Sequence, residues 1–445
     1  MQRLVLLFAI GSTAIGAIAS AQQPAGASPG TTGGVSTLTL GMLLDSVAAT
    51  HPLIGAAQAR VRAARGARRT AGTITNPILA YDVENAPLPG GASPTMSREV
   101  MTTLMLPLEE LYQRGPRVRR AGAELRGAEA DARAAIQRIQ LDAATAYSRV
   151  ALARVAVDAS RDVVSWLDTV VTYNRSRVRE GAAAEADLIR SEVERNRASA
   201  DAAMQEAELA QAFAELTAFL GDPRVPSTSD FVVAIDDLPL GAPGLVRGIE
   251  HEKPEVRAAR ERSSAAKAGV AAERSMFLRQ IGATVGTKRS EGISTLVAGV
   301  SLPVPLFDQN RGGLERARAE RDVAELELSA EQRQATAALA GATASATLLS
   351  NRLTTLAERD AAGRIAYLAR ADEGRRIALG AYREGAVALF QVIDATRAWA
   401  DARLAYYQLV YAQRQSILAL LVARGIPLTS ATVSADTNPP GSQPR

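Results

Sequence analysis

The stretch Val300–Arg318 reads Val-Ser-Leu-Pro-Val-Pro-Leu-Phe-Asp-Gln-Asn-Arg-Gly-Gly-Leu-Glu-Arg-Ala-Arg. It begins as an apolar run that ends at Pro303 and Pro305, because proline neither fits a helix interior nor donates to a sheet. A charged, alanine-rich pattern begins after Gly312-Gly313, which is typical of a helix. The stretch therefore predicts a strand that leads into a helix.

The same pattern occurs earlier in the chain. Leu106-Pro107 precedes Leu302-Pro303 by 196 positions (302 − 106), and Arg179-Glu180-Gly181 reappears as Arg383-Glu384-Gly385. A period near 200 residues is too long for a solenoid unit and indicates a duplicated half-protein. We predict a first repeat over residues 37–225, a connector over 226–243 and a second repeat over 244–428.

The composition favours long helices. Hydrophobic residues make up 47% of the chain but aromatic residues only 4%, and much of the apolar total is alanine. Alanine with regularly spaced Arg and Glu is typical of closely packed helices. The net charge of +4 is a small surplus from 51 basic and 47 acidic residues, so no nucleic-acid partner is implied.

The N-terminus has the features of a secretory signal. Residues 1–21 combine a basic start, an apolar core and a small-residue cleavage site, and residues 22–36 form a Gly/Pro/Ser-rich, flexible lead-in. We expect residues 429–445 to be a disordered tail. No later apolar run approaches the ~20 residues that a membrane helix needs. Cysteine is absent, which removes disulfides, thiolate catalysis and a lipid anchor.

Four short runs predict strands, two in each half. In the first, Leu79, Tyr81 and Val83 fall on one face and Asp82 and Glu84 on the other, which is the period-2 pattern of a sheet with one apolar side. A tight turn is expected over 289–292. The predicted strands are Asn76–Glu84, Arg98–Leu106, Gln280–Lys288 and Ile293–Leu302.

Heptad patterns predict long coiled-coil hairpins. A helix from Arg117 to about Glu180 would be on the order of 100 Å long, and a second spans Ala184–Leu220. We expect Gly181 and Gly385 to be the only breaks in these heptad runs. The first seam comprises Ile136, Ile139, Ala143, Ala146, Val150, Ala153, Val157, Ser160, Val164, Leu167 and Val171.

The number of strands requires several chains. Four amphipathic strands cannot close a barrel, and an open sheet in a bilayer leaves backbone groups unpaired at several kcal/mol each. Since about eight strands are the practical minimum, at least two copies must share one barrel, and three copies would supply twelve strands. The fold class is thus an α+β membrane protein whose shared transmembrane barrel continues into a periplasmic helical barrel.

These features resemble the TolC-type outer-membrane efflux proteins. The resemblance rests on His51-Pro52-Leu53, the Leu-Pro-Val-Pro-Leu-Phe-Asp strand exit, Tyr382-Arg383-Glu384-Gly385 and Val392-Ile393-Asp394-Ala395. Asn76-Pro77-Ile78-Leu79 and Leu106-Pro107-Leu108-Glu109 look most like the CzcC-type branch, which serves heavy-metal cation efflux. The resemblance implies a homotrimer in outer-membrane lipid, with a periplasmic adaptor and an inner-membrane pump of the resistance-nodulation-division type as partners.

The resemblance also implies roles at the two helix turns. By position, Asp187 and Asp394 occupy acidic gate positions and Tyr382 the gate tyrosine position, whereas Gln391 stands where some relatives have Asp and Val387 where some have Arg. The alternative for both aspartates is an ordinary solvated helix surface. The tip of each hairpin, expected to contact the adaptor, carries Arg179, Gly181, Arg383 and Gly385.

The sequence contains no recognisable catalytic site. His51 and His251 lack metal-binding spacing, and Ser264-Ala-Ala-Lys267 lacks the companion motifs of acyl-transfer enzymes, so no cofactor or metal is expected. A passive export duct for heavy-metal cations is our main hypothesis. The alternatives are a drug-efflux or type I secretion duct of the same fold, and a secreted coiled-coil structural or adhesion protein.

Overall fold

The computed structural model describes residues 36–86, 97–220, 231–232, 252–279 and 281–429. The predicted signal peptide, His251 and residues 430–445 of the predicted tail lie outside these residues. The elements in chain order are β1 Ser36–Thr37, α1 Leu40–Thr50, α2 Pro52–Gly72, β2 Ile78–Glu84, β3 Glu99–Pro107, α3 Glu110–Arg179, α4 Glu185–Thr217, β4 Phe231–Val232, α5 Pro254–Ser275, β5 Gly282–Ser290, β6 Ile293–Ser301, α6 Arg311–Leu356, α7 Ala366–Arg383 and α8 Leu389–Ala423.

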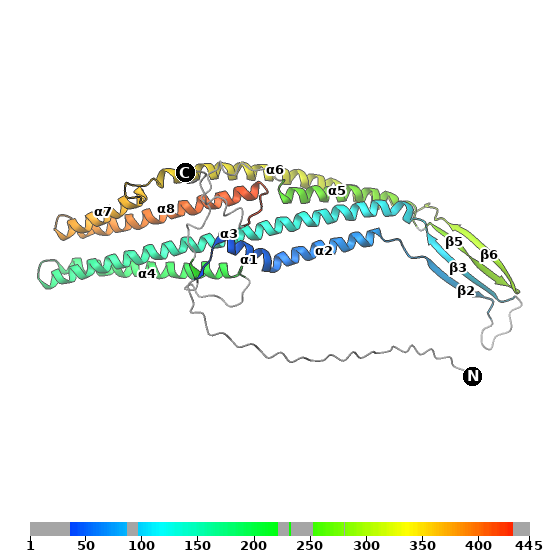
Figure 1. Ribbon diagram of the computed structural model, residues 1–445, viewed down its shortest axis with the longest axis horizontal. Helices are drawn as coiled ribbons and strands as arrows, with labels where there is room; N and C mark the ends of the chain where they lie inside the picture. Colours follow the sequence, from blue (N-terminus) through cyan, green and yellow to red (C-terminus); the bar gives the residue numbers. More distant parts are fainter. Residues whose placement is uncertain (1–35, 87–96, 221–230, 233–251, 280, 430–445) are drawn as a thin grey trace, which may run out of the picture. The chain divides into compact units, whose positions relative to one another are not determined.

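The four predicted strands are present and form one antiparallel sheet in the order β2-β3-β5-β6 (Figure 1). Strands β5 and β6 pair from Gly282 and Ser301 to Ser290 and Ile293. Their turn is shorter than predicted, because only Glu291 and Gly292 lie outside the ladder, with φ of 53° and 83°. Strands β2 and β6 are the two edges of this sheet.

Gly286 is required where β3 and β5 meet. A Cβ atom at this position would lie 2.2 Å from the carbonyl oxygen of Thr102, far inside van der Waals contact. The close approach follows from the register, in which Gly286 pairs with Thr103. Glycine therefore permits the central strand pair that joins the two halves of the chain.

Residues of the predicted heptad seams are buried or half-buried. Ala143, Val150 and Val157 of α3 are almost completely inaccessible, as are Val392 and Trp399 of α8. The prediction that the first long helix starts at Arg117 is wrong, because α3 starts at Glu110 and contains Pro116. Tertiary contacts stabilise the added turns: the Gln113 side-chain amide donates to the Leu278 carbonyl at 3.0 Å.

The second half contains a break that the heptads do not predict. Helix α6 ends at Leu356 and α7 begins at Ala366, so Gly181 and Gly385 are not the only breaks. The Asp360 carboxylate accepts hydrogen bonds from the amides of Ala362 and Arg364, both at 2.9 Å. Side-chain–backbone bonds of this kind compete with the helix, and Gly363, at φ 76°, completes the loop between the two helices.

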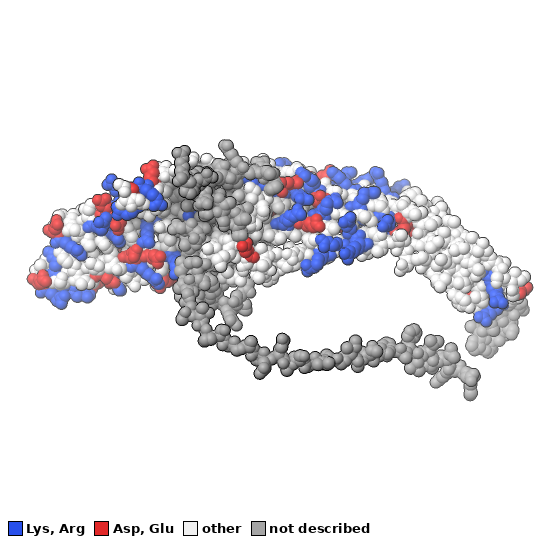
Figure 2. Space-filling view, in the orientation of Figure 1, with Lys and Arg blue, Asp and Glu red and all other residues white. Residues whose placement is uncertain are grey.

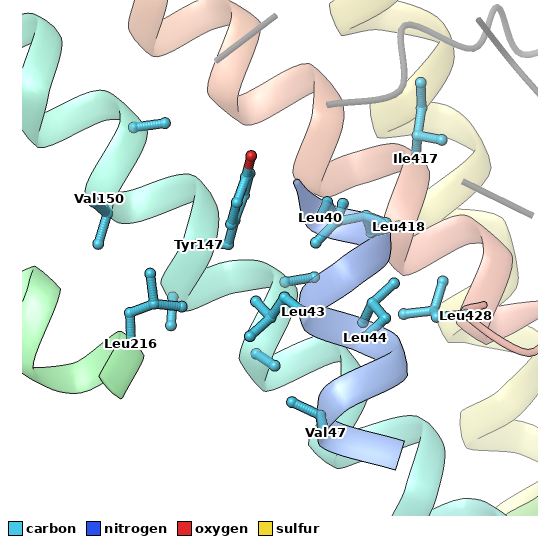
Figure 3. Close-up of a cluster of buried hydrophobic side chains, with 14 of the residues drawn as sticks. Leu40, Leu43, Leu44, Val47, Tyr147, Val150, Leu216, Ile417, Leu418 and Leu428 are labelled. Atoms are coloured by element: carbon cyan, nitrogen blue, oxygen red, sulfur yellow. The ribbon is translucent and has the colours of Figure 1, made fainter. Parts of the chain in front are cut away.

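Helix α1 fills the space between α3, α4 and α8. Leu40, Leu43, Leu44 and Val47 are fully buried, and Figure 3 shows them in one cluster with Tyr147 of α3, Leu216 of α4 and Leu418 of α8. Thr39 caps the helix, because its side-chain hydroxyl oxygen accepts a hydrogen bond from the Met42 amide.

No single described helix is long and apolar enough to cross a membrane, although the bent pair α1–α2 passes that test by length and composition.

A short strand pair lies at the predicted domain limits. Ser36, the last residue of the predicted lead-in, and Thr37 pair in parallel with Phe231 and Val232 of the predicted connector. This pairing joins segments almost 200 residues apart, so local composition gives no sign of it.

Candidate functional site at the two helix turns

The two predicted hairpin turns have the same backbone geometry. Gly181 and Gly385 have φ of 72° and 78°. In each turn, the amide of the residue after the glycine donates a hydrogen bond to the carbonyl oxygen five positions earlier. Ala182 donates to Arg177 at 2.8 Å and Ala386 to Ala381 at 2.9 Å. This is the Schellman arrangement that ends a helix with glycine in the left-handed region. Both glycines are exposed, as expected for hairpin tips.

A small apolar cluster joins the two hairpins near these turns. Leu167 and Val170 of α3 pack with Leu379 of α7 and with Val392 and Ile393 of α8. Val387 packs against the same cluster, which explains how an apolar residue is accommodated at this position of the turn. The α3–α4 and α7–α8 hairpins thus lie together in one chain, with their tips at the end away from the sheet (Figure 1).

Tyr382 is the most deeply buried of the predicted gate residues. Its side chain is buried, and its hydroxyl donates to Asn174 Oδ1 at 2.7 Å. Burial raises the pKa of the Tyr382 hydroxyl, the Asn174 bond partly offsets this, and the negative charge of Asp187 raises it further. The hydroxyl therefore stays protonated and acts as a hydrogen-bond donor at neutral pH.

A second tyrosine links the turn of α7 to α3. The Tyr173 hydroxyl donates to the Arg383 carbonyl oxygen at 3.0 Å, and its ring meets the Tyr382 ring edge-on at 5.9 Å between centroids. Arg383 itself is exposed, and so is Arg179, whose Nε donates to the Arg175 carbonyl. Both arginine side chains are thus available at the hairpin tips.

The predicted acidic residues differ in their surroundings. Asp187 is half-buried in the first turn of α4, close enough to Tyr382 to raise its pKa. Asp394 and Gln391 are exposed in the first turns of α8. Within the described part of one chain, no hydrogen bond or ion pair joins Asp394 to Asp187. One chain therefore brings Tyr382 close to Asp187.

An arginine between two tryptophans reinforces the contact of the hairpins. The Arg375 guanidinium lies 4.2 Å from the Trp166 ring centroid and 4.0 Å from that of Trp399. It also pairs with Asp372 at 2.9 Å, and its side chain is only 13% exposed. One cation thereby connects α3, α7 and α8.

Asn174 and this arginine site were not predicted from the sequence. Asn174 follows Val171 by three positions, so continuing the seam places a polar side chain at a buried position. That signal was present. Arg375 had no comparable signal, because Trp166 and Trp399 lie on two other helices.

The helices of the two hairpins are not packed throughout. A cavity of about 390 Å³ lies between α3, α4 and α8, lined by Leu167, Met204 and Thr396 among others, and Arg397 and Glu194 form an ion pair beside it. Among the described residues, no group of three or more His, Cys, Asp or Glu side chains could hold a metal ion.

Residues 43–222 and again 245–425 match the model of a protein family described as outer membrane efflux protein. The chain belongs to the outer membrane efflux protein family. It is therefore an outer-membrane protein that takes part in efflux from the cell.

Two curated relatives extend the comparison. The cobalt-zinc-cadmium resistance protein CzcC of Cupriavidus metallidurans is 27% identical, over 83% of this chain and 85% of its own length. The nickel-cobalt-cadmium resistance protein NccC of Alcaligenes xylosoxydans xylosoxydans is 25% identical, over 67% and 70% of the two chains.

Solved structures show the same fold. CusC, described for its transmembrane channel formation, superposes with a TM-score of 0.71 at 18% identity, covering 90% of this chain and 96% of its own. The outer membrane protein VceC of Vibrio cholerae gives a TM-score of 0.71 at 20% identity, covering 87% and 96%. The efflux-family fold therefore extends over nearly all of the described chain.

Proposed function

We propose that this chain is the outer-membrane duct of a tripartite efflux system that passively exports heavy-metal cations. The observation that carries the substrate class is the similarity to CzcC and NccC, both named for resistance to divalent metals. The pump that supplies energy would be of the resistance-nodulation-division type, with a periplasmic adaptor between pump and duct.

The open edges of the sheet support assembly as a trimer. Strands β2 and β6 are unpaired at their outer edges in one chain, and unpaired backbone is costly in a bilayer. Three copies that pair β6 of one with β2 of the next would close a twelve-stranded barrel. The exposed side chains of Leu79, Leu296 and Val300, each more than 70% accessible, would then face lipid.

The matching turns support two repeats of one unit. The family model matches the chain twice, and Gly181 and Gly385 end their helices by the same hydrogen bonds. We place the first repeat at 37–225, the connector at 226–243 and the second repeat at 244–428.

The hairpin tips are the proposed gate and the proposed contact with the adaptor. In a trimer, three copies of both turns would converge on one axis and bring Asp187 and Asp394 of every chain close together. Like charges in a narrow neck repel, so the closed state must hold them through hydrogen bonds, protonation or bound cations. Tyr382 and Gln391 would line the same constriction, and Arg179 and Arg383 would meet the adaptor.

Deleting the gene tests the substrate class. We expect increased sensitivity to Co, Zn, Cd or Ni, with resistance restored by the wild-type gene, whereas sensitivity to a drug panel alone would assign the duct to drug efflux.

The gate assignment is tested by a double variant. Asp187→Ala/Asp394→Ala should change single-channel conductance and cation selectivity in planar bilayers. Asp201→Ala/Asp401→Ala, which removes the same charge farther from the turns, serves as the control. Equal effects of both pairs would contradict the gate assignment.

A further inference from the structure

Helix α2 has an unusual charge composition. Its 21 residues include five arginines and no acidic residue. Arginines elsewhere commonly pair with carboxylates, as Arg161 does with Glu206 and Arg195 with Asp168, both at 2.8 Å. No ion pair with a described carboxylate involves the arginines of α2. Figure 2 shows the basic atoms gathered over this helix, toward the end nearer the sheet. This positive charge is therefore left for a partner.

An exposed apolar belt lies between these arginines and the sheet. The belt comprises Ile74, Leu111, Leu306 and Phe307, whose exposed fractions are 67, 85, 71 and 99%. Each of the four residues lies within ten residues of the end of a strand in the chain. Apolar side chains this exposed indicate contact with lipid or protein rather than water. Ile74 follows the end of α2, Leu111 lies in the first turn of α3, and Leu306 and Phe307 lie between β6 and α6. Exposed apolar side chains therefore continue beyond the ends of the strands.

Arg68 and Arg119 lie on the side of α3 that carries Leu111 of the belt. Gly122 follows Leu111 by about three helical turns and so shares its side of α3. A Cβ atom added to Gly122 would lie 3.9 Å from Arg68 Nε. A Cβ atom added to Gly115 would lie 3.6 Å from Arg119 Nη1. Arg65 and Arg69 flank Arg68 and are also exposed. These four residues, Arg65, Arg68, Arg69 and Arg119, are called the arginine row below.

The spacing between belt and row matches a membrane surface. Arg119 follows Leu111 by eight residues, about 12 Å along the helix, and Arg69 precedes Ile74 by only five residues. A headgroup layer is roughly 5–8 Å thick on each side of the bilayer, and an arginine side chain reaches several ångströms back toward its apolar neighbours. Guanidinium groups at this depth can bind phosphate oxygens in pairs of hydrogen bonds.

We propose that the arginine row binds the phosphate groups of anionic phospholipids in the leaflet that faces the helices. The inference rests on the proposed membrane duct and adds a lipid-binding site that holds it at a defined depth. An anionic cell-wall polymer could also meet the arginines, but it would leave the apolar belt uncovered, so lipid is the partner that accounts for both features.

The test compares two variants of the full-length protein with equal charge loss. Arg65→Gln/Arg68→Gln/Arg69→Gln/Arg119→Gln removes the row, and Arg138→Gln/Arg190→Gln/Arg352→Gln/Arg370→Gln removes four exposed arginines elsewhere. Binding of phosphatidylglycerol to the detergent-solubilised protein is measured by native mass spectrometry at several salt concentrations. We expect the row variant to bind at least about tenfold more weakly, with a smaller salt dependence, and the control to bind as the wild type does.

Three outcomes would overturn the inference: unchanged phosphatidylglycerol binding by the row variant, an equal loss of binding in the control variant, or a row variant that no longer binds isolated cell-wall polymer but still binds lipid.

A second measurement separates the lipid site from the proposed duct. Channel conductance of the wild type in planar bilayers is measured on the same preparation. A wild type that does not insert or conduct would refute the proposed duct. Normal conductance with unchanged lipid binding in the row variant would refute only the lipid site.

Discussion

The Tyr382 hydroxyl donates a 2.7 Å hydrogen bond to Asn174 Oδ1, and this bond joins α7 of the second half to α3 of the first. Asn174 is completely buried, and its Nδ2 has no hydrogen-bond partner among the described residues. Buried polar groups with one bond of this kind are sensitive to its loss. The contact therefore couples the stability of the hairpin pair to the position of the proposed gate.

Tyr382→Phe should lower the free energy of unfolding by about 1–3 kcal/mol, because it leaves the side-chain oxygen of Asn174, Oδ1, buried without a hydrogen-bond donor. Urea denaturation of the detergent-solubilised protein measures the change, and planar bilayers should show more frequent opening. Tyr367→Phe, which removes an exposed hydroxyl from the same helix, is the control and should have little effect. Equal destabilisation by both variants would contradict the importance of the bond.

The same tyrosine predicts a dependence of stability on alkaline pH. Burial raises the pKa of Tyr382 above its ordinary value near 10.0, so its contribution is complete below that pH. As the pH rises through the raised pKa, the folded state must hold a buried phenolate, and the contribution is lost. Denaturation between pH 8 and 11.5 should show a decline that is smaller in Tyr382→Phe. An identical decline in both proteins would argue against it.

Arg375→Met should weaken the contact of the hairpins, because it removes the cation between Trp166 and Trp399. We expect a loss of about 1–2 kcal/mol. The chain has only two tryptophans, so its tryptophan fluorescence, excited selectively over tyrosine, reports on this site and should change in wavelength or intensity. Arg376→Met is the control, since Arg376 shares Asp372 but is 58% exposed, and the described cation–π contacts of Trp166 and Trp399 do not include it. Unchanged emission in Arg375→Met would disprove the arrangement.

Gly286→Ala should prevent correct pairing of β3 and β5, because the added methyl group would overlap the Thr102 carbonyl. We expect little folded protein in the outer-membrane fraction and loss of heat-modifiable migration on gels. Gly299→Ala in β6 is the matched control, since a Cβ there has no neighbour within 4 Å. Normal assembly of Gly286→Ala would show that the strands tolerate a shift at this point.

Much of the local structure could be predicted because it depends on neighbours in sequence. Alternation of Leu79, Tyr81 and Val83 predicted β2, and the glycines at 181 and 385 predicted where two helices end, since both patterns follow from backbone geometry. The α6–α7 break was missed because Asp360 and Gly363 replace helical hydrogen bonds by a local loop within a continuing apolar pattern.

The sequence by itself determined the strands, the heptad seams and the hairpin turns, because hydrophobic period and glycine conformation act within a few residues. Only the tertiary structure decided which side chains meet at the turns. Asn174 and Tyr382 come from opposite halves of the chain, and Arg375 reaches tryptophans on two other helices. Such contacts depend on the rotation and axial offset of whole helices against one another, which no local pattern specifies.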